Sequence, residues 1–162
     1  IHDIDIMRYL SGEEVLSIYT AGGKVKNENH EDHVNLLMKF GNGKLGLCET
    51  NWLTPMKVRE LDITTTTHHI RLNYILQEIS LNSSSFGYLD ESNLYEVPVN
   101  MNEEKISIEE KEPLRNELED FLSSYTKKVN PMVTGIEGLR AVEIVEAGLE
   151  SLHAGCVINI NK

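Results

Sequence analysis

Two runs of alternating residues joined by a glycine turn constrain the fold of this chain more than any other feature. In Val34–Phe40 every second residue is apolar, and in Lys44–Trp52 Leu45 and Leu47 lie on one side. The turn between the runs is Gly-Asn-Gly, at Gly41–Gly43. Alternation on both sides of an Asn-Gly turn predicts an antiparallel β-hairpin.

Further strand patterns surround this hairpin. The runs predicted as strands are Val15–Ala21, Arg59–Thr65, His69–Leu81, Leu94–Val99 and Val157–Ile160. The segments predicted to interrupt them are Ser83–Ser85, Asp90–Asn93 and the acidic stretch Glu103–Glu112.

Three segments have helical periodicity. They are Asp3–Leu10, a helix that starts at Pro113 and ends near Lys128, and a helix from Thr134 to a stop at Gly155. Thr134 and Glu137 have the spacing of a capping box. The apolar stripes predicted on the last two helices are Leu114, Leu118, Phe121 and Leu122, and then Leu139, Val142, Val145, Leu149 and Leu152.

This order of elements predicts an α+β fold, in which helices pack on one face of a large, mostly antiparallel sheet. If the other face is apolar, a second subunit is its natural cover. The 162 residues suit a single domain, spanning positions 1–162.

Charge and composition exclude several function classes. Fifteen Lys and Arg against twenty-six Asp and Glu give a net charge of -11, which disfavours nucleic acid and anionic membranes as partners. The chain has no signal segment and no apolar run of about 20 residues, so we expect a cytoplasmic protein. Cys48 and Cys156 are expected to be buried, reduced thiols.

The sequence lacks the usual cofactor and metal motifs. It has no G-x-G-x-x-G turn, so we expect no nucleotide site within these residues. The pairs His30 and His33, and His68 and His69, lack companion ligands, which favours structural or surface roles over a metal site.

His2 and Asp5 stand three residues apart at the start of the first predicted helix. An imidazole and a carboxylate at the N-terminus of one helix can both face a substrate. The imidazole group is suited to proton transfer near neutral pH. On spacing alone, a capping His-Asp pair is the simpler interpretation.

Five segments, read together, resemble the C-terminal half of the glucose-fructose oxidoreductase / inositol dehydrogenase / MocA family of NAD(P)-dependent oxidoreductases. They occur in the order of that family and span nearly the whole chain. The segments are "HDIDIMRYLSGEEV" (His2–Val15), "VNLLMKFGNGKLG" (Val34–Gly46), "NWLTPMKVRELDIT" (Asn51–Thr64), "EPLRNELEDFL" (Glu112–Leu122) and "VTGIEGLRAVEIVEAGLES" (Val133–Ser151).

The resemblance implies a specific function. In this family an N-terminal Rossmann domain binds the nicotinamide, and the C-terminal domain holds the substrate and forms subunit contacts. His2 matches the catalytic histidine, which takes a proton from a sugar, polyol or nucleotide-sugar hydroxyl, and Asp5 matches the carboxylate that binds a substrate hydroxyl. The cofactor domain, the motif's first aspartate and the family's lysine lie outside these residues. We therefore expect NAD or NADP in the full-length protein only, and no turnover by the fragment.

Other candidates are weaker. Lys57 and Arg59 can meet an anionic group such as a nucleotide-sugar phosphate, although alternating charges more often mark a solvated strand face. Arg8 and Tyr9 suit packing or ion pairs at least as well as ligand binding. Trp52 can flank a sugar, but a lone tryptophan at a strand end is more often part of a core.

The sequence leaves a second function class open. A non-catalytic α+β dimerisation or ligand-binding module would also suit a chain without a cofactor motif. In the catalytic interpretation the partners are a small sugar or nucleotide-sugar and further copies of the chain, as a dimer or tetramer.

Overall fold

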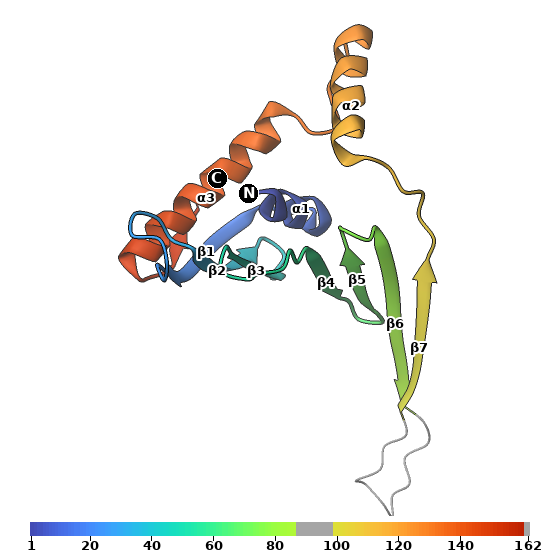
Figure 1. The fold of residues 1–162 in the computed structure, drawn as a ribbon, viewed down its shortest axis with the longest axis horizontal. Helices are drawn as coiled ribbons and strands as arrows, with labels where there is room; N and C mark the ends of the chain where they lie inside the picture. Colours follow the sequence, from blue (N-terminus) through green and yellow to red (C-terminus); the bar gives the residue numbers. More distant parts are fainter. Residues whose placement is uncertain (87–98, 161–162) are drawn as a thin grey trace, which may run out of the picture. The chain divides into compact units, whose positions relative to one another are not determined.

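A computed structural model describes residues 1–86 and 99–160 of the chain. Its elements, shown in Figure 1, are α1 (His2–Ser11), β1 (Val15–Gly23), β2 (His33–Phe40), β3 (Leu45–Asn51), β4 (Glu60–Thr64), β5 (His69–Asn73), β6 (Glu78–Phe86), β7 (Val99–Ile106), α2 (Pro113–Lys127), α3 (Gly135–Ala154) and β8 (Ile158–Asn159). Neighbouring strands in the described residues pair antiparallel. The predicted α+β class is confirmed.

The chain divides into two compact units. The first unit, Ile1–Pro55 with Glu117–Lys162, contains a sheet of strand order β3-β2-β1-β8. The second unit, Met56–Asn116, contains a sheet of order β4-β5-β6-β7. The strands are therefore distributed over two four-stranded sheets.

The predicted hairpin is strands β2 and β3. The backbone N–H of Phe40 donates to the Lys44 carbonyl at 2.9 Å, and that of Gly43 donates to the Phe40 carbonyl at 3.0 Å. Gly43 has a φ of 83°, a left-handed conformation that glycine adopts without strain. The Asn-Gly turn thus aligns the two strands as the sequence predicts.

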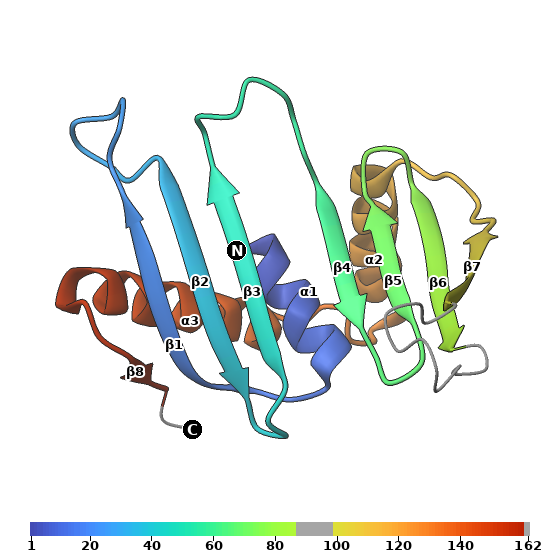
Figure 2. The same cartoon turned by 90° about the horizontal axis from the view of Figure 1, so that it is seen from below.

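The core of the first unit lies between its sheet and two helices. Helices α1 and α3 cover the same face of strands β1 to β3 (Figure 2). Their contribution to the core is Ile4 from α1 and Ile144 from α3. The buried cluster is completed by Val15, Ile18, Leu36, Met38, Phe40 and Cys48.

The face that helix α3 turns to the core only partly overlaps the predicted stripe, of which Val145 packs against the core. Leu139, Val142 and Leu149 of the predicted stripe are exposed. The residues that α3 buries are Ala141, Ile144, Gly148 and Ser151.

Small residues on α3 allow this close approach. A Cβ atom at Gly148 would lie 3.3 Å from the side chains of Ile18 and Thr20, closer than most Cβ contacts, so a larger residue would require these side chains to shift. The Ser151 hydroxyl accepts a hydrogen bond from the Thr20 backbone N–H at 2.9 Å and donates to the Cys156 carbonyl at 2.6 Å. Packing density and a buried hydroxyl, rather than large apolar side chains, therefore select the buried face.

The second sheet departs from the predicted strand limits. A turn splits His69–Leu81 into β5 and β6, where the Asn73 side chain accepts from the backbone N–H groups of Ile75 and Leu76 and Gln77 has a φ of 51°. Ser83–Ser85 lies inside β6 instead of ending it, and the acidic stretch Glu103–Glu112, which precedes the predicted change to helical periodicity, begins within β7. Most of the predicted strand Leu94–Val99 lies outside the described residues.

Three side-chain predictions are also corrected. The stripe of α2, whose bounds are as predicted, is exposed at Leu114, Leu118, Phe121 and Leu122. Cys156 is exposed, whereas Cys48 is buried, and burial raises the pKa of the Cys48 thiol. Trp52 is 90% exposed, so it is not part of a core.

Candidate active site

His2 and Asp5 lie together on the first turn of α1. The Asp5 backbone N–H donates to the Ile1 carbonyl at 3.1 Å, so this turn is already helical. Residues three apart lie on the same side of a helix. His2 is exposed and the Asp5 side chain keeps 33% of its surface exposed, which leaves both groups open to a ligand. Among the described residues, no side chain caps the start of α1, so His2 does not serve as a cap.

A buried arginine fixes this helix in place. Arg8 is only 6% exposed, and its Nε and Nη2 atoms donate to the two carboxylate oxygens of Glu14 at 3.1 and 2.7 Å. Its Nη1 atom lies 2.9 Å from a Glu137 carboxylate oxygen and donates to the Glu137 carbonyl at 3.4 Å. Arg8 therefore joins α1, the segment after it and the first turn of α3.

The predicted capping box at the start of α3 is wrong because of this arginine. Thr134 occupies the N-cap position, but its side chain makes no capping hydrogen bond. The Glu137 carboxylate is paired with Arg8 instead. A buried guanidinium without a partner costs far more than a lost cap, so the ion pair takes precedence.

Three carboxylates surround this single cation. The hydrogen bond from Arg8 to Glu14, followed by the charges of Glu14 and Glu137, raises the pKa of Arg8 against the opposing effect of burial. Asp5 is held most loosely, with its carboxylate 3.6 Å from Nη1 of Arg8. Within the described residues the Asp5 carboxylate makes no hydrogen bond, so its oxygens can accept hydroxyl groups from a ligand.

The other two predicted site residues belong to the second unit. Lys57 and Arg59 are both exposed in the segment before β4. The Arg59 carbonyl accepts from the Tyr74 backbone N–H at 3.0 Å, which anchors this segment to the turn after β5. The structure thus brings His2 and Asp5 together within one compact unit and places Lys57 and Arg59 in the other.

Sequence reasoning missed a buried aspartate in the loop between β1 and β2. The Asp32 carboxylate accepts hydrogen bonds from the backbone N–H groups of Val25, Lys26 and Asn27 at 2.6 to 3.1 Å, and it lies 3.1 Å from Nδ1 of His33. The Lys26 N–H is the largest of the effects that hold the pKa of Asp32 far below its usual range. No sequence motif marks this residue, because its donors are backbone groups.

Replacing Asp32 with Asn is expected to lower the Tm by several degrees at pH 7. The folded pKa of Asp32 is depressed, so its stabilisation is fully present above the unfolded pKa of about 3.9 and is lost as the pH falls toward the folded pKa. The Tm difference between Asp32→Asn and wild type should therefore shrink between about pH 4 and about pH 2, measured by thermal unfolding. Asp3→Asn, at an exposed position, is the control. A Tm difference that stays constant with pH would contradict this assignment.

Trp52 lies beside this loop. Its backbone N–H donates to the Asp32 carbonyl at 2.8 Å, while its indole projects into solvent. The alternative in which Trp52 stacks on a ligand stays a prediction.

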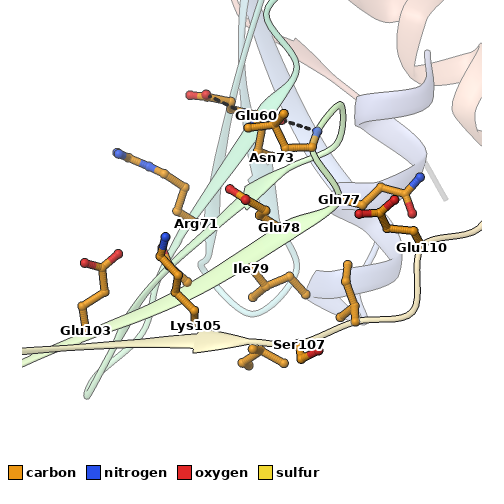
Figure 3. Close-up of a pocket in the computed structure, with 14 residues that line it drawn as sticks. Glu60, Arg71, Asn73, Gln77, Glu78, Ile79, Glu103, Lys105, Ser107 and Glu110 are labelled. Carbon is orange, nitrogen blue, oxygen red and sulfur yellow. Dashed lines mark hydrogen bonds between the residues drawn. The ribbon is translucent and has the colours of Figure 1, made fainter.

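The second unit has a groove of about 430 Å³ on the polar face of its sheet. Figure 3 shows Arg71 and Lys105 on neighbouring parts of this face with Glu60, Glu78 and Glu103 around them. The Asn73 amide donates to Glu60 at 3.2 Å, and the Gln77 side chain makes two hydrogen bonds with the backbone of Lys111. None of the predicted site residues lines this groove.

The paired histidines take part in local contacts. Besides the contact of His33 with Asp32, Nε2 of His69 lies 3.2 Å from Asp62, and Nδ1 of His68 lies 2.8 Å from the Thr67 hydroxyl. In residues 1–86 and 99–160, no three His, Cys, Asp or Glu side chains are arranged to hold a metal ion. A search of the same residues finds no helix of the length and apolar character that a membrane span requires.

Comparison with known proteins confirms the family resemblance over part of the chain. Residues 1–71 match the family model described as the GFO/IDH/MocA C-terminal domain. No curated protein sequence matches the chain.

Solved structures share the fold across nearly the whole chain. UDP-N-acetylglucosamine 3-dehydrogenase from Acidithiobacillus ferrooxidans has a TM-score of 0.81 at 17% identity, covering 94% of this chain and 47% of that one. Aldose-aldose oxidoreductase from Caulobacter crescentus, in complex with glycerol, has a TM-score of 0.75 at 14% identity, covering 98% and 45%. The WlbA dehydrogenase from Bordetella pertussis, in complex with NADH and UDP-GlcNAcA, has a TM-score of 0.68 at 16% identity, covering 99% and 43%. The chain spans about half the length of these oxidoreductases.

Proposed function

We propose that this chain, whose residues 1–71 match the GFO/IDH/MocA C-terminal domain, is the substrate-binding part of an NAD(P)-dependent dehydrogenase. The reaction is oxidation of a hydroxyl group on a sugar, polyol or nucleotide-sugar. The observation that carries this proposal is the place of the exposed His2 and the half-buried Asp5 on the first turn of α1. Solved structures of similar fold support the substrate class, since they include a UDP-N-acetylglucosamine 3-dehydrogenase and an aldose-aldose oxidoreductase.

The cofactor belongs to another part of the full-length protein. Dinucleotides bind where a parallel strand leads through a glycine-rich turn into a helix. Strand neighbours in the described residues are antiparallel, so these residues do not fit a dinucleotide site. NAD or NADP, bound elsewhere, would accept the hydride.

His2 is the proton acceptor in this proposal. Oxidation of an alcohol removes a hydride from carbon and a proton from oxygen, and a neutral imidazole nitrogen can take that proton. The exposed position of His2 at the start of α1 allows a hydroxyl to approach to hydrogen-bond distance.

Asp5 orients the substrate. Sugars and polyols carry hydroxyl groups on adjacent carbons, so a carboxylate beside the base can accept a hydrogen bond from the neighbouring hydroxyl. The loose 3.6 Å contact with Arg8 leaves the Asp5 oxygens available for this bond. Lys57 and Arg59 are proposed to meet an anionic group, such as the diphosphate of a nucleotide-sugar.

Activity of the full-length protein tests the proposal. A panel of free sugars, polyols and UDP-sugars is incubated with NAD or NADP, and reduced cofactor is followed by absorbance. We expect turnover with at least one member of the panel and none by residues 1–162 alone. A full-length protein that binds neither cofactor would instead support the non-catalytic dimerisation or ligand-binding module.

We also propose that the open face of the first sheet joins copies of the chain into a dimer or tetramer. Tyr19, Leu37 and Leu47 are adjacent across β1, β2 and β3, and all three are exposed on the face opposite the helices, with Leu45 nearby. An apolar row of this kind on a sheet face is typical of a subunit interface.

The double substitution Leu37→Asp with Leu47→Asp is expected to convert the full-length oligomer into a monomer. Two buried carboxylates facing their copies across the interface would repel one another and lose hydration. Light scattering coupled to size exclusion measures the mass. Val25→Asp, at an exposed apolar position in the β1–β2 loop, should leave the mass unchanged. An unchanged oligomer in the double variant would rule out this face.

A further inference from the structure

The Nη1 atom of Arg8 is contacted by two carboxylates at unequal distances. The Glu137 carboxylate lies 2.9 Å from this nitrogen and the Asp5 carboxylate 3.6 Å. The same nitrogen also donates to the Glu137 carbonyl at 3.4 Å. Glu137 therefore meets this nitrogen twice, through a hydrogen bond to its carbonyl and through the nearer of the two carboxylates.

The other two nitrogens of the guanidinium face Glu14. Nε and Nη2 are both engaged by Glu14, in a two-point hydrogen bond of 3.1 and 2.7 Å. Asp5 and Glu137 therefore compete for one nitrogen of a side chain that is almost fully buried. The shorter distance shows that Nη1 of Arg8 is paired mainly with the Glu137 carboxylate.

We propose that Glu137 is a positioning residue for the substrate, because its hold on Arg8 keeps the Asp5 carboxylate free. This inference rests on the proposed role of Asp5 as a hydroxyl-binding group. Without the Glu137 carboxylate, Nη1 of Arg8 loses its nearer anion, and Asp5, one helical turn away, is the other carboxylate within reach of this nitrogen. Asp5 then closes onto Arg8 and is withdrawn from the ligand.

Glu137 belongs to a distant part of the chain, 129 residues after Arg8. It lies on the first turn of α3, in the same compact unit as α1. The side chain of Glu137 thus acts through Arg8 on Asp5, the carboxylate proposed to bind the substrate. Glu137 itself does not contact the substrate in this proposal.

A double-mutant cycle in the full-length protein tests the competition without any substrate. In the wild type, Asp5→Asn is expected to change the Tm by less than about 1 °C, because Arg8 is already satisfied. In a Glu137→Ala background the same substitution is expected to cost roughly 3 °C, because Asp5 has become the partner of Arg8. Additive effects on the Tm would overturn the proposal.

Kinetics on the best substrate of the panel test the functional consequence. Glu137→Ala is expected to raise KM about 10-fold with kcat within about a factor of two, since it removes one substrate hydrogen bond. Glu137→Gln keeps an oxygen acceptor for Arg8 and is expected to restore KM in part. In an Asp5→Asn background, Glu137→Ala should have no further effect on KM.

The control is Glu143→Ala, on the same helix, where the carboxylate pairs with Arg140 at 2.7 Å and not with Arg8. It should leave KM unchanged. If Asp5→Asn raises KM but Glu137→Ala does not, the positioning role is wrong and the role of Asp5 stands. If Asp5→Asn leaves KM unchanged, the proposed function of Asp5 itself fails.

Discussion

Replacing His2 with Ala in the full-length protein is expected to lower kcat by about 100- to 10,000-fold, the range of a lost general base. His2 is the imidazole beside Asp5 on the first turn of α1, and the alanine variant leaves the buried Arg8 contacts of that helix in place. The Tm should therefore stay within a degree or two of wild type. Reduction of NAD or NADP at saturating substrate measures the effect.

His153→Ala is the matched control for this experiment. His153 is an exposed histidine on the last turn of α3, and its replacement should leave kcat unchanged. A His2→Ala protein that reduces the cofactor near the wild-type rate would show that His2 is not the base. In that case the exposed pair on α1 would be a surface feature of a binding module.

The features predicted correctly from the sequence depend on neighbours in the chain. The β2–β3 hairpin follows from alternation and an Asn-Gly turn, and the helix that carries His2 and Asp5 follows from its apolar periodicity. The stop of α3 at Gly155 likewise follows from its left-handed conformation, with a φ of 65°.

The predictions that were wrong concern contacts between residues far apart in the chain. The buried face of α3 is chosen by how closely Gly148 and Ser151 approach β1, which a count of apolar side chains does not detect. Likewise, the capping box fails because Arg8, far away in sequence, attracts Glu137. The serines of β6 and the acidic residues of β7 are a further example. Pairing between these two strands keeps them in a sheet despite their low strand propensity.

The candidate site was predictable to the same extent. Spacing and family resemblance identify His2 and Asp5, but neither indicates that Asp5 shares a guanidinium nitrogen with Glu137. Asp32 was missed for a related reason. Its partners are backbone N–H groups, which nearly every residue type supplies, so the sequence does not reveal them. A site built on side chains from one helix is readable from sequence, whereas its supporting contacts are not.

Replacing Arg8 with Met is expected to lower the free energy of unfolding of the first unit by about 3 kcal/mol, because it breaks a buried ion-pair network and leaves Asp5, Glu14 and Glu137 facing one another. Thermal or urea unfolding at pH 7 measures the loss.

Arg71→Met provides the comparison. Arg71 donates to Asp62 at 2.8 Å, but its side chain is 56% exposed and the pair is screened by solvent, so the loss should be far smaller than that of Arg8→Met. Equal losses from Arg8→Met and Arg71→Met would mean that the Arg8 network does not hold α1 against α3. A large loss at Arg8 alone would show that the helix carrying His2 and Asp5 is fixed by charges at its buried end, which leaves the first turn free to bind and react.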